Sequence, residues 1–271
     1  MNEVLTKTNE EQKEEPSSSI SQENELMVTL DELFLANMHF GYKTKYRNPW
    51  MNSYIFASRN GIDIIDLTKT VITFNKALQA LKKCVARGGK VLFVGTEAHT
   101  SAMTRLQAER CAQYFINKRW LGGLLTNWRN TCESIISMKK IELQIEDGYL
   151  TNFKKSEQTR IIKKRDRFKR FLGGIKDMDT PPNMIVISSN RERNAIKEAL
   201  KLNIPIVLLM DTTTNPEGIY HGIPGNDRSV KAVDKFISKC ADACLAGLRE
   251  EMHNLEVAKV ESAKAEAAQQ A

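Results

Sequence analysis

Apolar residues recur at helical spacing in the first third of the chain. Side chains three or four positions apart fall on one face of an α-helix, because the helix turns once in about 3.6 residues. The apolar positions with this spacing are Val71, Phe74, Leu78, Leu81 and Val85. Gly88 and Gly89 follow, and glycine is typical of a helix end. We therefore expect an amphipathic helix that ends before Gly88.

Short continuous apolar runs come next, of the kind that is buried in a parallel sheet. They occupy residues 91–95, 114–116, 184–187 and 204–210. Helical patterns occupy residues 98–111 and 191–202, and a last helix carries Val230, Val233, Ile237, Cys240 and Cys244. Strands that alternate with helices indicate an α/β fold, here a parallel-sheet three-layer sandwich of the flavodoxin or Rossmann type.

One stretch interrupts this alternation. Residues 130–172 contain no strand pattern but two helical stripes, the first with Ile135, Met138, Ile141 and Ile145, the second with Ile161, Phe168 and Leu172. Residues 147–152 between them have the composition of a turn. We expect an antiparallel, coiled-coil helical hairpin inserted into the α/β domain.

The composition predicts four parts. Residues 1–27 are polar and Glu-rich and predict a disordered acidic tail. Residues 28–129 and 173–246 form the α/β domain, and residues 130–172 form the hairpin. Residues 247–271 are rich in Ala, Glu and Lys, so they are either a frayed extension of the last helix or a second tail.

The positive charge is unevenly distributed. The whole chain carries +7 and residues 1–26 carry −5, so residues 27–271 carry the difference, +12. A basic body favours a polyanionic partner, with nucleic acid ahead of an anionic membrane, although ordinary solubilising charge is the alternative. Residues 154–170, in the second arm of the hairpin, hold nine basic and two acidic residues, which strengthens the polyanion interpretation over a merely solvated helix face.

Catalytic and metal-binding motifs do not stand out. A single glycine, Gly95, follows the first strand where a dinucleotide site needs three, and the chain has neither a phosphate-binding loop nor a nucleophile elbow. Its four histidines show no metal-ligand spacing, and its five cysteines are typical of buried free thiols in a reducing compartment. We expect Asp211–Thr213 and Gly225–Asp227 to form turns and helix caps. We expect no enzyme activity, cofactor, bound metal, small-molecule substrate or membrane span.

Three segments combine basic, aromatic and glycine residues in what we interpret as loops: residues 38–61, 117–128 and 172–178. Lysine and arginine neutralise phosphates, while tyrosine and tryptophan stack on unpaired bases. The alternative for Trp120, Leu124 and Leu125 is that they anchor the hairpin to the sheet, and we favour that core role for Trp120. With the basic arm, these segments give the candidate RNA-binding residues Lys43, Lys45, Arg47, Asn48, Arg59, Lys118, Arg119, Asn127, Arg129, Lys163, Lys164, Arg165 and Lys176.

The same segments resemble one family. RWLGGLLTNW, followed at the right distance by LGGIKDM, together with LFVGT and IPGND, is similar to the bacterial-type small-subunit ribosomal protein 2 family, from about Thr29 to Leu245. The resemblance implies a parallel α/β sandwich with a helical hairpin and a structural, non-catalytic role in the small ribosomal subunit. It implies small-subunit rRNA and neighbouring small-subunit ribosomal proteins as partners.

Two departures from the family pattern affect the expected compartment. The family usually reads HFGHQT where this chain has Tyr42 and Lys43, and a usual lysine pair is replaced by Glu97 and Ala98. Such departures suit an organellar ribosome or an unusual bacterium. We slightly favour the mitochondrial matrix or another organelle over the bacterial cytoplasm. Two other classes of function stay open: a nucleotide-dependent α/β enzyme and an interaction scaffold outside the ribosome.

Overall fold

The computed structural model describes residues 27–148 and 154–269. A five-stranded sheet forms its centre, with strand order β5-β4-β6-β7-β8 and every neighbouring pair parallel. The strands are β4 (Val91–Val94), β5 (Tyr114–Ile116), β6 (Met184–Ile187), β7 (Ile206–Met210) and β8 (His221–Pro224). The predicted tail therefore lies outside the described residues, except for Met27.

Helices cover both faces of this sheet, and successive strand residues, which point to opposite faces, belong to two different cores. Val91 and Phe93 belong to the core shared with α3 (Leu67–Val85), α4 (Ala98–Arg110) and α8 (Val230–Gln269). Leu92 and Val94 belong to the core shared with α7 (Arg193–Lys201). The predicted three-layer α/β sandwich is confirmed.

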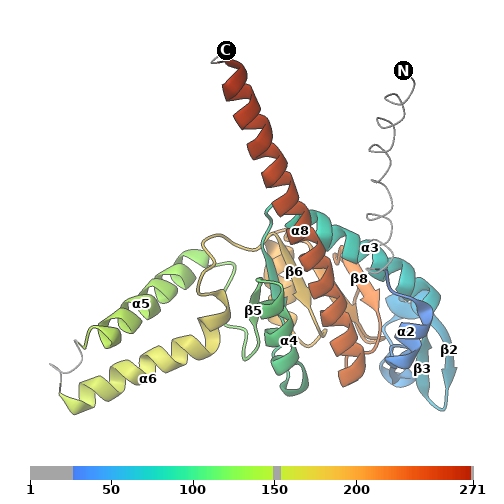
Figure 1. Ribbon diagram of the computed structural model, residues 1–271. Coiled ribbons are helices and arrows are strands. Elements are labelled where there is room, and N and C mark those ends of the chain that lie inside the picture. The colour runs from blue at the N-terminus through green and yellow to red at the C-terminus, as the bar shows by residue number, and fades with distance from the viewer. Residues whose placement is uncertain (1–26, 149–153, 270–271) are drawn as a thin grey trace, which may run out of the picture.

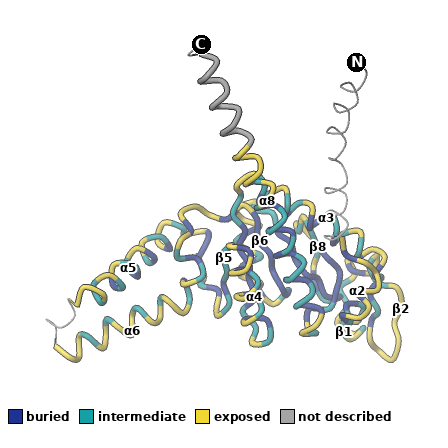
Figure 2. The backbone as a smooth tube through the Cα atoms, in the orientation of Figure 1, coloured by how far each residue is buried: buried dark blue, intermediate teal, exposed yellow. Residues whose placement is uncertain are grey.

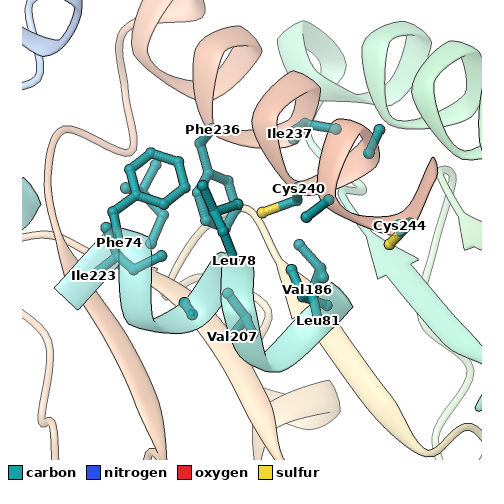
Figure 3. Close-up of a cluster of buried hydrophobic side chains, with 14 of the residues drawn as sticks. Phe74, Leu78, Leu81, Val186, Val207, Ile223, Phe236, Ile237, Cys240 and Cys244 are labelled. Atoms are coloured by element: carbon teal, nitrogen blue, oxygen red, sulfur yellow. The ribbon is translucent and has the colours of Figure 1, made fainter. Parts of the chain in front are cut away.

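The first of these two cores joins α3 and α8 to the sheet. Figure 3 shows Phe74 and Leu78 of α3 packed against Phe236 of α8, above the strand residues Val207 and Ile223. Cys240 and Cys244 lie on the same side of α8, fully buried, and both thiols are free. The expectation that these cysteines belong to the apolar stripe of the last helix is confirmed.

A second, smaller sheet corrects the interpretation of residues 38–61 as loops. It is antiparallel, with strand order β1-β3-β2, and consists of β1 (Phe40–Lys43), β2 (Ile55–Arg59) and β3 (Ile62–Ile65). Asn60 and Gly61 join β2 to β3 with φ angles of 52° and 73°, the left-handed conformation that a tight two-residue hairpin turn requires. Helix α2 (Leu30–Leu35) precedes the sheet, and the short 3₁₀ helices η1 (Thr44–Tyr46) and η2 (Pro49–Tyr54) lie between β1 and β2.

Two long helices occupy the region of the predicted hairpin. Helices α5 (Trp128–Glu146) and α6 (Lys155–Leu172) contact each other and project together from the body of the protein (Figure 1). We call them the α5–α6 arm. Residues 149–153 between them lie outside the described residues, and the division of the chain into four parts stays a prediction. The short 3₁₀ helix η4 (Gly173–Ile175) leads back from α6 to the sheet.

At the C-terminal end, α8 runs without a break to Gln269. Of the two alternatives predicted for this region, residues 247–269 therefore form an extension of the last helix. Within the described residues, no helix is long and apolar enough to cross a membrane.

Candidate nucleic-acid interface

The predicted RNA-binding residues fall into three groups on the structure. The first lies on and beside the small sheet, the second flanks a loop at residues 120–126, and the third lies on the α5–α6 arm. Most of them are exposed: Lys43, Lys45, Arg59, Lys118, Arg119, Asn127, Arg129, Lys163 and Lys164. The others are only partly exposed: Arg47, Asn48, Arg165 and Lys176.

The small sheet brings together two basic residues that are distant in sequence. Lys43 on β1 and Arg59 on β2 both lie opposite Ile62 on β3. Residues directly opposite each other in adjacent strands share a face of the sheet, so Lys43 and Arg59 flank Ile62 on one face. Exposed Lys45 follows in η1. This face therefore presents positive charge beside exposed apolar surface.

Arg47 occupies a different environment. Its guanidinium donates hydrogen bonds to both carboxylate oxygens of Asp63, a side chain with no exposed surface, and one more to Ser58. The pairing with Arg47, together with hydrogen bonds from Ser58 and Thr44, holds the pKa of Asp63 below its usual value although burial acts in the opposite direction. Arg47 therefore has a structural partner inside the protein.

Asn48 also makes contacts within the fold. Its side-chain oxygen accepts a hydrogen bond from the Trp50 backbone amide at 3.1 Å, which caps η2. The backbone amide of Asn48 donates to the Thr212 carbonyl at 2.9 Å. These contacts fix the position at which the small sheet meets the end of β7. Trp50 itself is exposed.

The loop at residues 120–126 wraps around one carboxylate. Glu198, on α7, accepts hydrogen bonds from Trp120 Nε1 at 2.9 Å and from the amides of Gly123 at 2.8 Å and Leu125 at 2.9 Å. The amide and hydroxyl of Thr126 add contacts at 3.2 and 3.3 Å. Burial raises the pKa of Glu198, but these donors outweigh it and the net shift is downward.

Trp120 is 6% exposed and packs in the core together with Leu124 and Leu125. The core role predicted for Trp120 is confirmed. Lys118 and Arg119 lie immediately before the loop and Asn127 and Arg129 immediately after it, all exposed. Arg129 lies 3.5 Å from Glu133, but its side chain is 91% exposed, so this pair contributes little.

Helix α6 carries a group of cations without ion-pair partners in the described part of the chain. Arg160, Lys163, Arg167 and Arg170 recur at spacings of three or four residues, so they form one stripe along the helix. All four are exposed, and none forms an ion pair within residues 27–148 and 154–269. Lys164 is exposed beside the stripe, with its ammonium 5.6 Å from the Phe168 ring centre. At a rise of 1.5 Å per residue the stripe is about 15 Å long.

This stripe changes which residues of α6 are the best candidates for RNA binding. Arg160, Arg167 and Arg170 were absent from the predicted set, although their helical spacing is visible in the sequence. Arg165, which was in the set, is only 28% exposed and pairs with Asp166 at 2.6 Å. Figure 2 shows that most of α6 is exposed, in contrast with the buried strands β4, β6 and β7 of the large sheet.

Lys176 makes an ion pair with α5. It follows η4 and pairs with Glu142 of α5 at 2.8 Å, a contact that raises the pKa of Lys176. Nearby, Lys139 pairs with Asp177 at 3.2 Å. These ion pairs tie α5 to the segment that follows α6.

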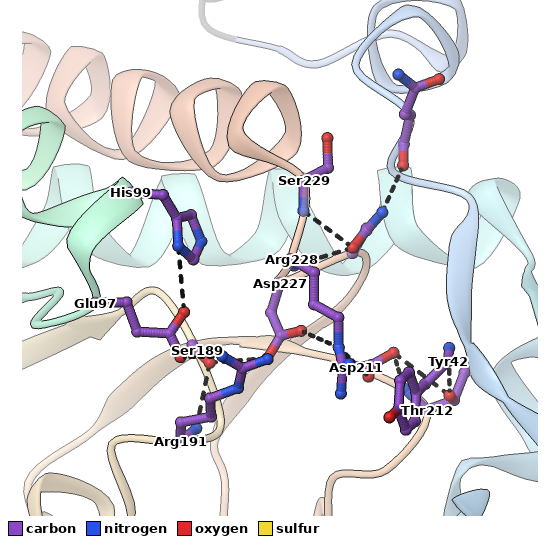
Figure 4. A network of polar contacts seen from close by, with 12 residues as sticks. Tyr42, Glu97, His99, Ser189, Arg191, Asp211, Thr212, Asp227, Arg228 and Ser229 are labelled. Atoms are coloured by element: carbon purple, nitrogen blue, oxygen red, sulfur yellow. Dashed lines mark hydrogen bonds and ion pairs between the residues drawn. The ribbon is translucent and has the colours of Figure 1, made fainter.

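A network of acidic and basic side chains lies at the carboxyl ends of the parallel strands (Figure 4). Asp211 and Asp227 are buried there, and Arg228 Nε lies 3.8 and 3.9 Å from their carboxylates. Burial and the neighbouring Asp227 raise the pKa of Asp211 to about 6. The Arg228 guanidinium stacks 3.5 Å from the centre of the Tyr42 ring.

The same network joins the small sheet to the large one. The Tyr42 amide donates to Thr212 Oγ1 at 3.0 Å, and the Thr212 amide donates to Asp211 at 2.7 Å. Asn226 accepts from the amides of Arg228 and Ser229, as expected of a cap for the last helix. We interpret this edge as a structural junction. No group of three or more His, Cys, Asp or Glu side chains in the described part of the chain is arranged to hold a metal ion.

Comparison with known proteins gives a consistent result. A family model described as ribosomal protein S2 matches residues 33–247, a range that contains every predicted RNA-binding residue. Small ribosomal subunit protein uS2 of Paramagnetospirillum magneticum is 41% identical over 225 residues, which cover 83% of this chain and 85% of that protein. The protein of the same name in Oleidesulfovibrio alaskensis is 42% identical over 221 residues, covering 81% of this chain and 85% of that protein.

Proposed function

The chain belongs to the ribosomal protein S2 family, and we propose that it is a structural constituent of the small ribosomal subunit that binds small-subunit rRNA and neighbouring small-subunit proteins. Its role in translation follows from its place in the ribosome. The prediction that the chain is not an enzyme is confirmed by its family, whose members have structural roles.

The cationic stripe of α6 is the observation that supports RNA as a partner most directly. Four exposed basic residues without ion-pair partners in the described part of the chain lie on one side of a helix that projects from the body. Unpaired like charges in a row repel each other, so the folded protein alone gains nothing from them. A phosphate backbone would neutralise them and release its condensed counterions, which favours binding.

The other two groups extend this surface. Lys118 and Arg119 immediately precede the loop at residues 120–126, Arg129 follows it at the start of α5, and Lys43 and Arg59 share a face of the small sheet. Their exposed cations provide phosphate contacts that position RNA without reading its sequence. The exposed apolar side chains beside Lys43 and Arg59, Phe40 and Ile62, suit a neighbouring protein as well.

The two alternative functions are not favoured. A nucleotide-dependent enzyme lacks the phosphate-binding glycines, and the carboxyl edge where a nucleotide would lie is filled by the Asp211–Arg228 network. An interaction scaffold outside the ribosome has no support from the family match or from the two relatives.

For the compartment, we propose the ribosome without an organellar preference. Both named relatives are bacterial and give no support to the mitochondrial matrix or another organelle. Cell fractionation that separates organelles from cytoplasm tests this part of the proposal.

A sucrose gradient of a native lysate tests the ribosomal role. The wild-type chain should sediment with the small subunit at low salt and leave it only in a high-salt wash, since phosphate contacts weaken by ~0.7–0.9 log units per contact per tenfold rise in salt. A chain that stays at the top of the gradient at low salt contradicts the proposal.

A charge-reversal pair localises the contact. The triple variant Lys163→Glu, Lys164→Glu, Arg167→Glu should lose small-subunit occupancy while its melting temperature stays unchanged. The matched control reverses Lys76, Lys83 and Arg87, which are exposed on or just after α3, away from the arm in Figure 1. Equal losses in both triple variants would show that total charge, rather than the arm, determines binding.

A further inference from the structure

The loop at residues 120–126 has the geometry of an anion-binding site that is already occupied by the protein itself. Backbone amides that converge on one point form a site for a phosphate or a carboxylate. Here the amides of Gly123, Leu125 and Thr126 converge, joined by Trp120 Nε1 and the Thr126 hydroxyl. The anion is the Glu198 carboxylate, which comes from a different element, α7.

We propose that Glu198 is a positioning residue for RNA binding, an internal anion that holds this loop in one conformation and so places the cations on either side of it. The inference rests on the proposed function and extends it to a residue that does not itself touch RNA. Lys118 and Arg119 precede the loop, and Arg129 follows it at the start of α5.

The geometry shows why the loop depends on this carboxylate. Gly123 has a φ of +82°, a left-handed conformation, so the chain turns sharply at this point. A sharp turn leaves backbone amides without the regular partners of a helix or a strand, and buried amides need an acceptor. Glu198 Oε1 accepts from Trp120 and Gly123, while Oε2 accepts from Leu125 and Thr126, so each oxygen holds one half of the loop.

The position of the loop links the carboxylate to the arm. Thr131, in the first turn of α5, donates its hydroxyl to the Leu124 carbonyl at 2.9 Å, and Asn127 donates its amide to Gly123 at 2.8 Å. The loop therefore fixes the start of α5 as well as the Lys118–Arg119 pair. Loss of the carboxylate should loosen both sets of cations together.

The sign of the effect separates this role from simple electrostatics. Removal of a negative charge from an RNA-binding protein normally strengthens RNA binding, because it removes repulsion. Glu198→Ala should instead weaken binding. Glu256→Ala is the matched control, since it removes the same charge from an exposed position on α8. It should leave the affinity unchanged or slightly raise it.

The test measures binding of the full chain to a transcript of a complete bacterial small-subunit rRNA over a range of salt concentrations. For Glu198→Ala we expect about tenfold lower affinity and a salt dependence that is shallower by about 2 log units per tenfold change in salt, as expected when two or three phosphate contacts are lost. Wild-type affinity and salt dependence in this variant would overturn the inference.

Chemical rescue provides a readout that general destabilisation does not move. Alanine keeps the Cβ atom, and acetate has the size and charge of the atoms that are removed. Sodium acetate should restore the RNA affinity of Glu198→Ala to within about twofold of wild type, relative to sodium chloride at equal ionic strength, because a bound acetate again accepts from the converging amides and holds the loop. Failure of acetate to restore binding in a folded variant would contradict the positioning role.

A second variant covers the case in which Glu198→Ala does not fold. Glu198→Gln keeps the volume and one acceptor oxygen but turns an NH2 group toward the donors of the loop. The salt dependence of its RNA binding should therefore also become shallower, but by less than in Glu198→Ala. Wild-type salt dependence in a folded Glu198→Gln would overturn the inference. If the wild-type chain itself binds no rRNA, the proposed function fails first, and the positioning role fails with it. An acetate-dependent rise in the melting temperature of Glu198→Ala would then show a role for Glu198 in the loop alone.

Discussion

Residues 43–47 and helix α6 look alike in sequence, since both are basic and both contain aromatic residues, yet they use their arginines differently. Arg47 is paired with fully buried Asp63 through two hydrogen bonds. On α6, Arg160, Arg167 and Arg170 are exposed and have no ion-pair partner in the part of the chain that the structure describes. A basic residue in a basic segment thus stabilises either the fold or a complex, and its partner decides which.

The largest expected effect is on the Arg47 side of this comparison. Arg47→Ala leaves the Asp63 carboxylate buried with only the hydroxyls of Thr44 and Ser58, and removal of one partner of a buried ion pair typically costs about 3–5 kcal/mol. We expect a loss of about 3 kcal/mol in the free energy of unfolding, since the two hydroxyls remain. Urea denaturation measures it.

Two controls accompany that variant. Lys45→Ala removes an exposed cation two residues away and should change stability by less than about 0.5 kcal/mol. The double variant Arg47→Met, Asp63→Leu removes both charges and should recover much of the stability. A single Arg47→Ala variant as stable as the wild type would show that Asp63 does not need Arg47, and Arg47 would then return to the RNA-binding set.

A second buried carboxylate, Asp211, sharpens the comparison because its cation is farther away. Arg228 Nε lies 3.8 Å from Asp211 and is shared with Asp227, so burial and the Asp227 charge prevail and the pKa of Asp211 rises to about 6. A raised pKa means that the folded protein binds this proton more tightly than the unfolded chain. The stability that it contributes is complete below the unfolded pKa, near 3.8, and is lost as the pH rises through about 6.

Asp211→Asn isolates this contribution, because the amide does not titrate. The stability of the wild type relative to Asp211→Asn should fall by about 3 kcal/mol between pH 4 and pH 7, at about 1.4 kcal/mol for each unit of pKa shift. Denaturation of both proteins across that pH range measures the difference. A constant difference would mean that Arg228 neutralises Asp211 as fully as Arg47 neutralises Asp63.

Four strands of the large sheet could be predicted from the sequence, but its edge strand β8 and the small sheet could not. Strands β4, β6 and β7 are continuous apolar runs because helices cover both of their faces. β3 has Asp63 within its apolar run, and β8 reads His-Gly-Ile-Pro, so neither shows the pattern of a buried strand. Asn60-Gly61 was the available indication of the small sheet, since that dipeptide favours a two-residue hairpin turn.

The candidate interface was predictable only in part, for a related reason. The sequence identifies basic segments, and helical spacing identifies the stripe of Arg160, Lys163, Arg167 and Arg170. It does not show that Arg47 meets Asp63, or that Glu198 meets a loop more than 70 residues before it. The tertiary fold brings these partners together. Such contacts between distant residues determine which basic residues are paired within the protein and which are exposed without an ion-pair partner.

The smallest expected effect concerns two nearby arginines of α6. One is ion-paired within the protein and the other is not, so they repeat the comparison within a single helix. Arg167 lies in the exposed stripe, whereas Arg165 is less exposed and pairs with Asp166. Arg167→Ala should make the salt dependence of rRNA binding shallower by about 1 log unit per tenfold change in salt, as expected for one lost phosphate contact. Arg165→Ala should change it by much less, because its charge is already balanced within the protein. Equal changes would show that the ion pair with Asp166 does not prevent Arg165 from contacting RNA. The RNA-binding arginines of α6 could then be predicted from sequence alone, whereas Arg47, whose partner Asp63 is buried, could not.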